Sequence, residues 1–296
     1  MNIFITFTLL IPNSACMQPI VVAVDFSTSS IHAIEYAIPL ANKLKCDIIL
    51  VWVDKISSNE SLYPDTSYQN RNEAKKRFDE IILQFGKKMN KGLKMEFKLR
   101  KGKVFHEVDT LAKSLGALLV ITGTHGVSGF EEFWIGSNAF RIVTYASSPV
   151  ITVRHDFEIK KSMERIVVPV DGSSETIQKL PFVARLAKLF KSEVHVVATH
   201  SSHLNSIQRI AEKYLQMSVA YFQANDIHCV QDSMVSNDVT KALLQYAVNV
   251  KADLIAIMTE QETPVNILLG AQAQQMINQS SIPILSVHPQ EHFCLK

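Results

Sequence analysis

Short apolar runs alternate along the chain with longer segments in which apolar residues recur every three or four positions. The short runs are rich in Val, Ile and Leu, which is typical of strands buried on both faces of a parallel sheet. The longer segments have the period of amphipathic helices. In the first half, the runs predict strands at 20–24, 46–53, 94–99, 117–122 and 149–153. The periodic segments predict helices at 29–45, 70–90, 104–115 and 139–146.

One segment, residues 55–69, shows neither period. It is polar and rich in turn-forming residues, so we expect a loop there. A loop of this length is unusual within a compact domain and is often functional, so it is expected to lie over a site.

The whole pattern then repeats. The segment RIVVPVDGSSE at 165–175 matches PIVVAVDFSTS at 19–29, which places Asp171 146 residues after Asp25. Later the spacing falls to 134, as in the pair Gly136 and Gly270. A tandem duplication explains both matches.

Alternating strands and helices predict an α/β fold with parallel strands and right-handed crossovers. Two copies predict two tandem five-stranded parallel sheets, each with helices on both faces. The expected domains are residues 17–154 and 164–289, joined by a polar linker at 155–163.

Composition narrows the classes of partner. A chain of 296 residues suits two domains, and its net charge of +2 comes without a basic stripe interleaved with aromatic residues. We therefore expect no nucleic-acid partner. The basic run between Lys87 and Lys103 is interpreted as a solvated surface, with an acidic partner as the alternative. The four cysteines have no paired spacing, which favours reduced thiols and a cytoplasmic location.

The first sixteen residues are apolar but too short to span a bilayer, and no Lys or Arg precedes the apolar run. Met17 is followed directly by the first predicted strand. We expect translation to start at Met17, with secretion as the minor alternative, and we expect no membrane partner.

Candidate chemistry gathers between the strand at 117–122 and the helix at 139–146. Three glycines stand there, in the pattern Gly123-x2-Gly126-x9-Gly136-Ser137. Glycine permits φ > 0 and a close approach of the backbone to a ligand. Ser137 and Asn138 open the helix, where unpaired N–H groups and the helix dipole favour an anion. This arrangement predicts a site for a polyphosphate.

An acidic residue belongs to the same site. Asp25 ends the first strand and Gly123 follows the fourth, so both reach one crevice if these strands are neighbours. The alternative for Asp25 is a helix N-cap, and for the glycines an ordinary loop that needs φ > 0. His200 and His203 have a spacing that zinc can use, but no Cys or carboxylate cluster joins them, so we expect no metal site.

Both halves resemble the universal stress protein family over nearly the whole chain from Met17. The resemblance rests on VVAVDFS at 21–27, GTHG at 123–126, GSNAFRIV at 136–143 and SSPVITV at 147–153. It implies the adenine nucleotide alpha-hydrolase-like fold with strand order 3-2-1-4-5. It also implies ATP or AMP, with Mg²⁺ as an option, bound between the first and fourth strands.

The resemblance further implies the role of each site residue. Val24 and Asp25 would contact the adenosine, and the backbone of Val53 would face the adenine. The phosphates would be held by residues of the glycine loop and the helix start, namely Gly123, Gly126, Gly136, Ser137 and Asn138.

The second half departs from this pattern. Met258 and Gln261 stand where Gly123 and Gly126 are expected, and Ala271 replaces Ser137. Glu260 and Glu262 would place negative charge near a phosphate. We therefore predict one nucleotide per chain, in the first half, with Asp171 as a relic or a cap.

Three functions follow from these features. The first is a nucleotide-binding stress-response protein whose occupancy switches a conformation or a partner surface. The second is a slow ATPase or autophosphorylating enzyme that uses the same loop, although no catalytic constellation is visible. The third is an interaction scaffold without nucleotide. In this family single domains pair through their last strands, so we expect 149–153 beside 283–287, and a homodimer of chains as a further option.

Overall fold

The structure is a computed structural model that describes residues 18–54, 64–124, 135–200, 205–259 and 269–289. The strands of the first half are β1 (Ile20–Ala23), β2 (Ile48–Asp54), β3 (Met95–Lys101), β4 (Leu119–Gly123) and β5 (Val150–Val153). Its helices are α1 (Thr28–Leu44), α2 (Pro64–Phe85), the short 3₁₀ helix η1 (Gly86–Lys88), α3 (Val104–Leu115) and α4 (Ser137–Tyr145).

The second half repeats this series of elements. Its strands are β6 (Arg165–Val170), β7 (Glu193–His200), β8 (Cys229–Val235), β9 (Leu254–Met258) and β10 (Ile284–Val287). Its helices are the 3₁₀ helix η2 (Ser174–Ile177), α5 (Leu180–Phe190), α6 (Asn205–Ala224), α7 (Val239–Asn249) and α8 (Ala271–Gln279).

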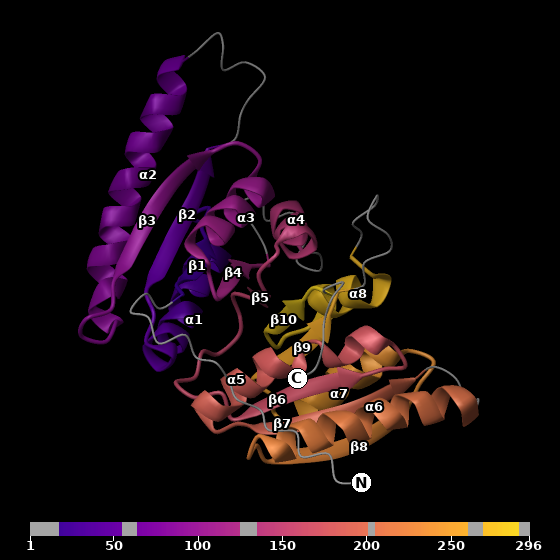
Figure 1. The fold of residues 1–296 in the computed structure, drawn as a ribbon. Helices are drawn as coiled ribbons and strands as arrows, with labels where there is room; N and C mark the ends of the chain where they lie inside the picture. Colours follow the sequence, from indigo (N-terminus) through magenta and orange to yellow (C-terminus); the bar gives the residue numbers. More distant parts are fainter. Residues whose placement is uncertain (1–17, 55–63, 125–134, 201–204, 260–268, 290–296) are drawn as a thin grey trace.

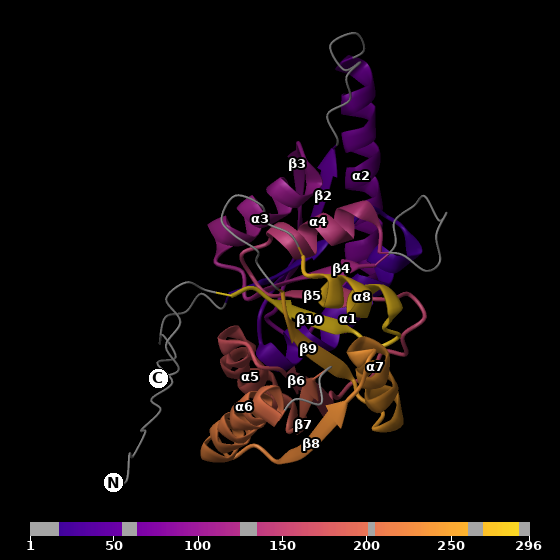
Figure 2. The ribbon, with the colours of Figure 1, turned by 90° about the vertical axis from the view of Figure 1, so that its right-hand side faces the viewer.

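The described strands form one sheet in the order β3-β2-β1-β4-β5-β10-β9-β6-β7-β8. Within each half the order is the predicted 3-2-1-4-5 and the pairs are parallel. The prediction of two separate parallel sheets is wrong, because β5 and β10 pair antiparallel, with Leu285 opposite Ile151. This contact is the predicted pairing of the two last strands, and it converts two sheets into one mixed sheet (Figure 2).

The sheet is buried on both faces, and its strands alternate between two cores. On β1, Ile20 and Val22 belong to one core, and Val21 and Ala23 belong to the other. Helices α1, α2, α5 and α6 contribute to the first core, and α3, α4, α7 and α8 contribute to the second. The sheet twists strongly, so that β2 and β3 stand upright in Figure 1 while β7 and β8 lie nearly horizontal.

The antiparallel joint fixes where the two halves place their crevices. Parallel strands of an α/β half carry ligands at their carboxyl ends. Because β5 and β10 run in opposite directions, the carboxyl ends of the two halves lie at opposite edges of the sheet. Two potential crevices are therefore separated rather than merged.

Most predicted boundaries differ from the observed ones by one or two residues, and the largest differences are at the two ends of α2, which was predicted at 70–90. Helix α2 begins at Pro64, inside the segment that was expected to be a loop until residue 69. Proline fits the first turn of a helix because no N–H is required there, and the polar residues that follow gave no helical period. Residues 55–63 lie outside the described residues.

Candidate functional site

A cleft lies at the carboxyl ends of β1 and β4 and has a volume of ≈ 520 Å³. These two strands are neighbours, with Ala23 opposite Thr122. On the other side, β1 pairs with β2, so the cleft marks the point where the crossover direction switches. The expectation that Asp25 and Gly123 reach one crevice is confirmed, since both line it.

The cleft collects most of the residues that the sequence indicated. Seven of the eight predicted residues line it, and the eighth, Gly126, lies outside the described residues. The seven are Val24, Asp25, Val53, Gly123, Gly136, Ser137 and Asn138.

Sequence reasoning missed several lining residues. Asp54 directly follows Val53 at the end of β2, so the rule that strand ends carry ligands could have found it. Val104 and Val108 are one helical turn apart at the start of α3, so the helical period of the sequence could have placed them on one face of that helix. Asn70 comes from α2, whose contribution depends on how the helix crosses the sheet and has no signal in the sequence.

Asp25 builds a turn at the entrance of α1. Its Oδ1 accepts hydrogen bonds from the backbone N of Ser27 at 3.1 Å and from Ser27 Oγ at 2.6 Å. The N-cap of α1 is Ser27, whose side chain accepts from the backbone N of Ser30. The alternative interpretation of Asp25 as the N-cap is therefore wrong. Asp25 is half-buried and lines the cleft.

The second half repeats this turn. Asp171 Oδ1 accepts from the backbone N of Ser173 at 2.8 Å and from Ser173 Oγ at 2.6 Å. The backbone N of Asp171 donates to Thr176 Oγ1, just as that of Asp25 donates to Ser30 Oγ. The turn is thus a feature of the fold, and Asp171 is exposed where Asp25 is half-buried.

The backbone of Gly123 and Gly136 does not have the positive φ that glycine permits. Gly136 has φ −58° and ψ 145°, which any residue adopts, and Gly123 has no positive φ. The expectation of φ > 0 is wrong for both. A Cβ on Gly123 would lie 2.7 Å from the backbone C and O of Ser29, so glycine is needed for α1 to pack against the end of β4.

At the corresponding place in the second half stands Met258, and the packing differs. The segment that begins at Ser174, 146 residues after Thr28, is the 3₁₀ helix η2, and α5 begins only at Leu180. A side chain at 258 leaves less room for a helix start than Gly123 does. Gln261, Glu260 and Glu262 lie outside the described residues.

A buried lysine lies beneath the turn of the second half. Lys179 is 1% exposed, and its Nζ donates to the carbonyl oxygen of Thr176 at 2.6 Å and to Thr176 Oγ1 at 3.3 Å. Burial lowers the pKa of this ammonium to about 8, against the opposing effect of Asp171. Ala33 occupies the corresponding position of α1.

The far end of the first cleft is formed by the start of α4. The backbone N of Gly136 donates to the carbonyl oxygen of Thr124 at 2.6 Å, and Ser137 and Asn138 follow in the first turn. Free N–H groups and the helix dipole make this end suitable for an anion. Among the described lining residues, the charged ones are Asp25 and Asp54, so the positive end comes from the backbone.

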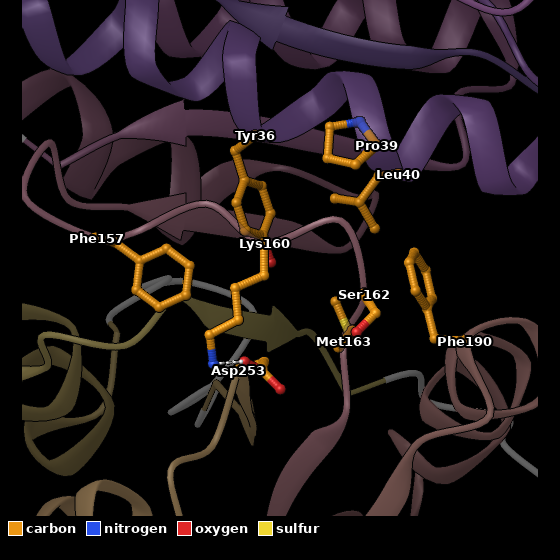
Figure 3. A pocket seen from close by; sticks show the side chains of 9 residues that line it. All are labelled: Tyr36, Pro39, Leu40, Phe157, Lys160, Ser162, Met163, Phe190 and Asp253. Carbon is orange, nitrogen blue, oxygen red and sulfur yellow. Dashed lines mark hydrogen bonds and ion pairs between the residues drawn. The ribbon is translucent and has the colours of Figure 1, made fainter.

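A second, much smaller cavity of ≈ 20 Å³ lies where the linker meets both halves (Figure 3). Phe157 contributes its carbonyl oxygen to a 2.8 Å hydrogen bond from His32 Nε2 on α1, and Lys160 Nζ lies 2.8 Å from Asp253 Oδ1. The space suffices for about one water molecule. This junction fastens the linker to α1 and to the start of β9, and it is too small for a nucleotide.

No group of three or more metal-ligating side chains occurs in the described ranges. His200 is described and buried, whereas His203 lies outside the described residues. No helix within the described ranges is long and apolar enough to cross a membrane.

The fold and the cleft define an α/β protein with a crevice at a topological switch point. Comparison with known proteins shows which family has this fold. The sequence profile of the universal stress protein family matches residues 17–154 and 163–288, so the chain belongs to that family and contains two tandem copies of its domain.

Two relatives and one solved structure illustrate the likeness. Universal stress protein MJ0531 of Methanocaldococcus jannaschii is 28% identical over 139 residues, which are 46% of this chain and 82% of the relative. Universal stress protein YxiE of Bacillus subtilis is 29% identical over 142 residues, 45% of this chain and 96% of the relative. The crystal structure of a universal stress protein from Archaeoglobus fulgidus superposes with a TM-score of 0.71 at 18% identity, over 92% of this chain and 98% of that one, and shows the same fold.

Proposed function

We propose that this universal stress protein binds one adenine nucleotide, ATP or AMP, in the cleft of its first half, and that occupancy serves as a signal in a stress response. The observation that carries the proposal is the meeting of Asp25, Gly136 and Ser137 in one cleft at the switch point of the sheet. The cleft volume of ≈ 520 Å³ lies within the range typical of small-molecule sites, about 300–1,000 Å³.

The proposed pose follows the chemistry of the two ends of the cleft. The Asp25 carboxylate accepts from ribose hydroxyls, while the backbone around Val24 and Val53 faces the adenine. The N–H groups at the start of α4, with Ser137 and Asn138, donate to the phosphates. Gly123 and Gly126 complete the phosphate loop in this proposal.

The electrostatics of the cleft indicate what must accompany a triphosphate. Asp25 and Asp54 are acidic, and the described lining offers only the backbone dipole as a positive end. ATP therefore needs a divalent cation such as Mg²⁺, which binds phosphate oxygens together with water. AMP has less charge to balance and can bind without it.

We propose that the second half binds no nucleotide. Met258 replaces the glycine that lets α1 approach β4, and Ala271 replaces the serine at the helix start. Gly270 keeps the conformation of Gly136, with φ −55° and ψ 146°, so the helix start is retained without its hydroxyl. In this half, η2 stands where α1 begins in the first half, and Lys179 Nζ donates to the carbonyl oxygen of Thr176 in η2.

Binding is favoured over phosphoryl transfer by the state of Asp25. Its Oδ1 accepts from Ser27 Oγ at 2.6 Å, and the proposed pose gives its other oxygen to the ribose, so this carboxylate is not assigned to an attacking water. We also propose a cytoplasmic, reducing location for this nucleotide-binding protein. Cys46 is 3% exposed and burial raises the pKa of its thiol to about 11, so it stays an unreactive thiol.

The paired variants Asp25→Ala and Asp171→Ala test the proposal, because both remove the same turn from equivalent places. We expect the Kd for MgATP to rise about 10- to 100-fold in the first variant, from the loss of charge-assisted hydrogen bonds of about 1.5–3 kcal/mol. The second variant should leave the Kd within about twofold of the parent.

Thermal unfolding of both variants provides the control, since each loses a similar turn and should show a similar drop in Tm. Equal loss of MgATP affinity in both, or a loss only with Asp171→Ala, would contradict the assignment of the site to the first half.

A further inference from the structure

Two hydrogen bonds cross from the second half onto the element that ends the cleft of the first. Asn278 Oδ1, on α8, accepts from the backbone N of Ile135 at 2.9 Å. His288 Nε2, directly after β10, donates to the carbonyl oxygen of Val143 at 2.7 Å. Figure 2 shows α4 and α8 on the same side of the joint between β5 and β10.

Both contacts are well defined. The side chain of Asn278 is 9% exposed, so water competes little for its hydrogen bond with the backbone N of Ile135. Since a carbonyl can only accept, Nε2 of His288 carries the proton, and Nδ1 accepts from Thr259 Oγ1 at 2.6 Å. Both ring nitrogens are thereby used, which fixes the orientation of the ring.

The two contacted groups lie at the two ends of α4. Ile135 immediately precedes Gly136, whose backbone N closes the loop on Thr124. Val143 lies in the last turn of the same nine-residue helix. The second half therefore holds α4 at two places, just before its start and near its end. The first turn of this helix carries Ser137 and Asn138, which line the cleft.

Among the described residues, the first half does not make the equivalent hydrogen bonds to α8. Helices α4 and α8 correspond with a shift of 134 residues, so Thr144 and Arg154 correspond to Asn278 and His288. Thr144 Oγ1 donates to the carbonyl oxygen of Phe140 within its own helix, at 2.9 Å. Arg154 Nε donates to Asp156 at 3.3 Å. Two halves that pair through equivalent strands thus differ in what they do for each other.

We infer that the second half is a built-in positioning unit for the nucleotide site of the first half. Asn278 and His288 hold α4 in the orientation that presents its N–H groups to the phosphates, and this role rests on the proposed function. Because linkage is reciprocal, a nucleotide that binds α4 in this orientation must in turn strengthen the docking of α8. Asn278 and His288 are positioning residues and do not touch the nucleotide.

The first test compares Asn278→Ala with Asn225→Ala in the full chain, with MgATP as the probe. Asn225 is a matched control, since it is 6% exposed in the second half and bonds Lys188 and Tyr221, away from α4. Loss of one buried hydrogen bond predicts a rise in Kd of about 5- to 10-fold for Asn278→Ala. Asn225→Ala should destabilise the second half without changing the Kd.

Hydrogen exchange supplies a readout that a merely structural role would not move. MgATP should slow exchange of the peptide that covers α8 in the parent chain, and this slowing should disappear in Asn278→Ala. If Asn278→Ala does not fold, His288→Ala and His288→Gln decide, because glutamine can restore the donor to Val143. The alanine variant should raise the Kd and the glutamine variant should recover most of the affinity.

Parent-like affinity in both Asn278→Ala and His288→Ala would overturn the inference while leaving the nucleotide site intact. A parent chain that does not bind MgATP would overturn the proposed function itself, and the two failures are therefore distinguished by the parent titration.

Discussion

Asp25 shows that one side chain can serve the fold and remain available to a ligand. The same Asp–Ser turn occurs at Asp171, so the turn alone says nothing about nucleotide binding. What separates the two residues is their surroundings: Asp25 lines a cleft, whereas Asp171 is exposed above a buried lysine. The sequence predicted Asp25 as a site residue from its place at a strand end, but it could not reveal the shared turn.

Lys179 is the clearest difference between the two halves at the level of a single side chain. It is buried where the first half has Ala33, and its place at the N-cap of α5 gave no sign of burial in the sequence. Its hydrogen bonds to Thr176 satisfy the ammonium in part. A lysine whose pKa is lowered in the folded state weakens that state wherever the unfolded chain binds more protons.

Replacing Lys179 by methionine should therefore stabilise the protein at pH 7, by on the order of 1–3 kcal/mol. The folded-state pKa of about 8 lies below the ordinary value of 10.5. Between these values the unfolded state holds more protons than the folded state, so the parent gains stability as pH rises. The advantage of Lys179→Met should shrink over this window.

Urea unfolding of the parent and the variant from pH 7 to 10 measures this difference. Lys191→Met is the matched control, because Lys191 is an exposed lysine that caps the other end of α5 and should give a small, pH-independent change. A Lys179→Met difference that stays constant with pH would show that the buried ammonium is not the cause.

At the scale of elements, the sequence predicted the strands and most helices because their periods are strong. The start of α2 was missed because its first residues are polar. Asn70 was inside the predicted helix, but its place in the cleft depends on how that helix crosses the sheet. The glycine pattern led to residues that line the cleft, but it did not reveal why position 123 must be glycine. Gly123 is required by the backbone of Ser29, a contact between segments nearly 100 residues apart in sequence.

Gly123→Ala should displace the start of α1, because the new Cβ would meet the backbone of Ser29 at 2.7 Å. Overpacking of this kind typically costs about 1–3 kcal/mol, and the shift should also weaken MgATP binding by moving the turn at Asp25. Gly172→Ala is the control, since its Cβ would lie 3.6 Å from the Cγ2 methyl of Ile210, an ordinary van der Waals distance.

Chemical denaturation and MgATP titration of the two alanine variants check this expectation. If Gly123→Ala is as stable as Gly172→Ala, the close approach of α1 to β4 is not what requires glycine, and the loss would have to be sought in the loop itself.

At the scale of the whole molecule, the internal repeat predicted the tandem fold, and the resemblance to the universal stress protein family predicted the pairing of the last strands. It did not predict that this pairing makes one mixed sheet, because the two orders 3-2-1-4-5 are compatible with separate or joined sheets. The repeat also gave no sign that the two halves have different roles. Asn278 and His288 have no distinctive motif, and only their contacts to α4 reveal a supporting role for the second half.

The account rests on one claim, that the chain holds a single nucleotide and holds it in the first half. Titration calorimetry of MgATP into the full chain, with Asp25→Ala run beside it, tests the claim most directly. We predict a stoichiometry near one per chain in the parent and a Kd about 10- to 100-fold higher in the variant. A stoichiometry near two, or an absence of heat from a protein that releases no nucleotide on denaturation, would contradict it.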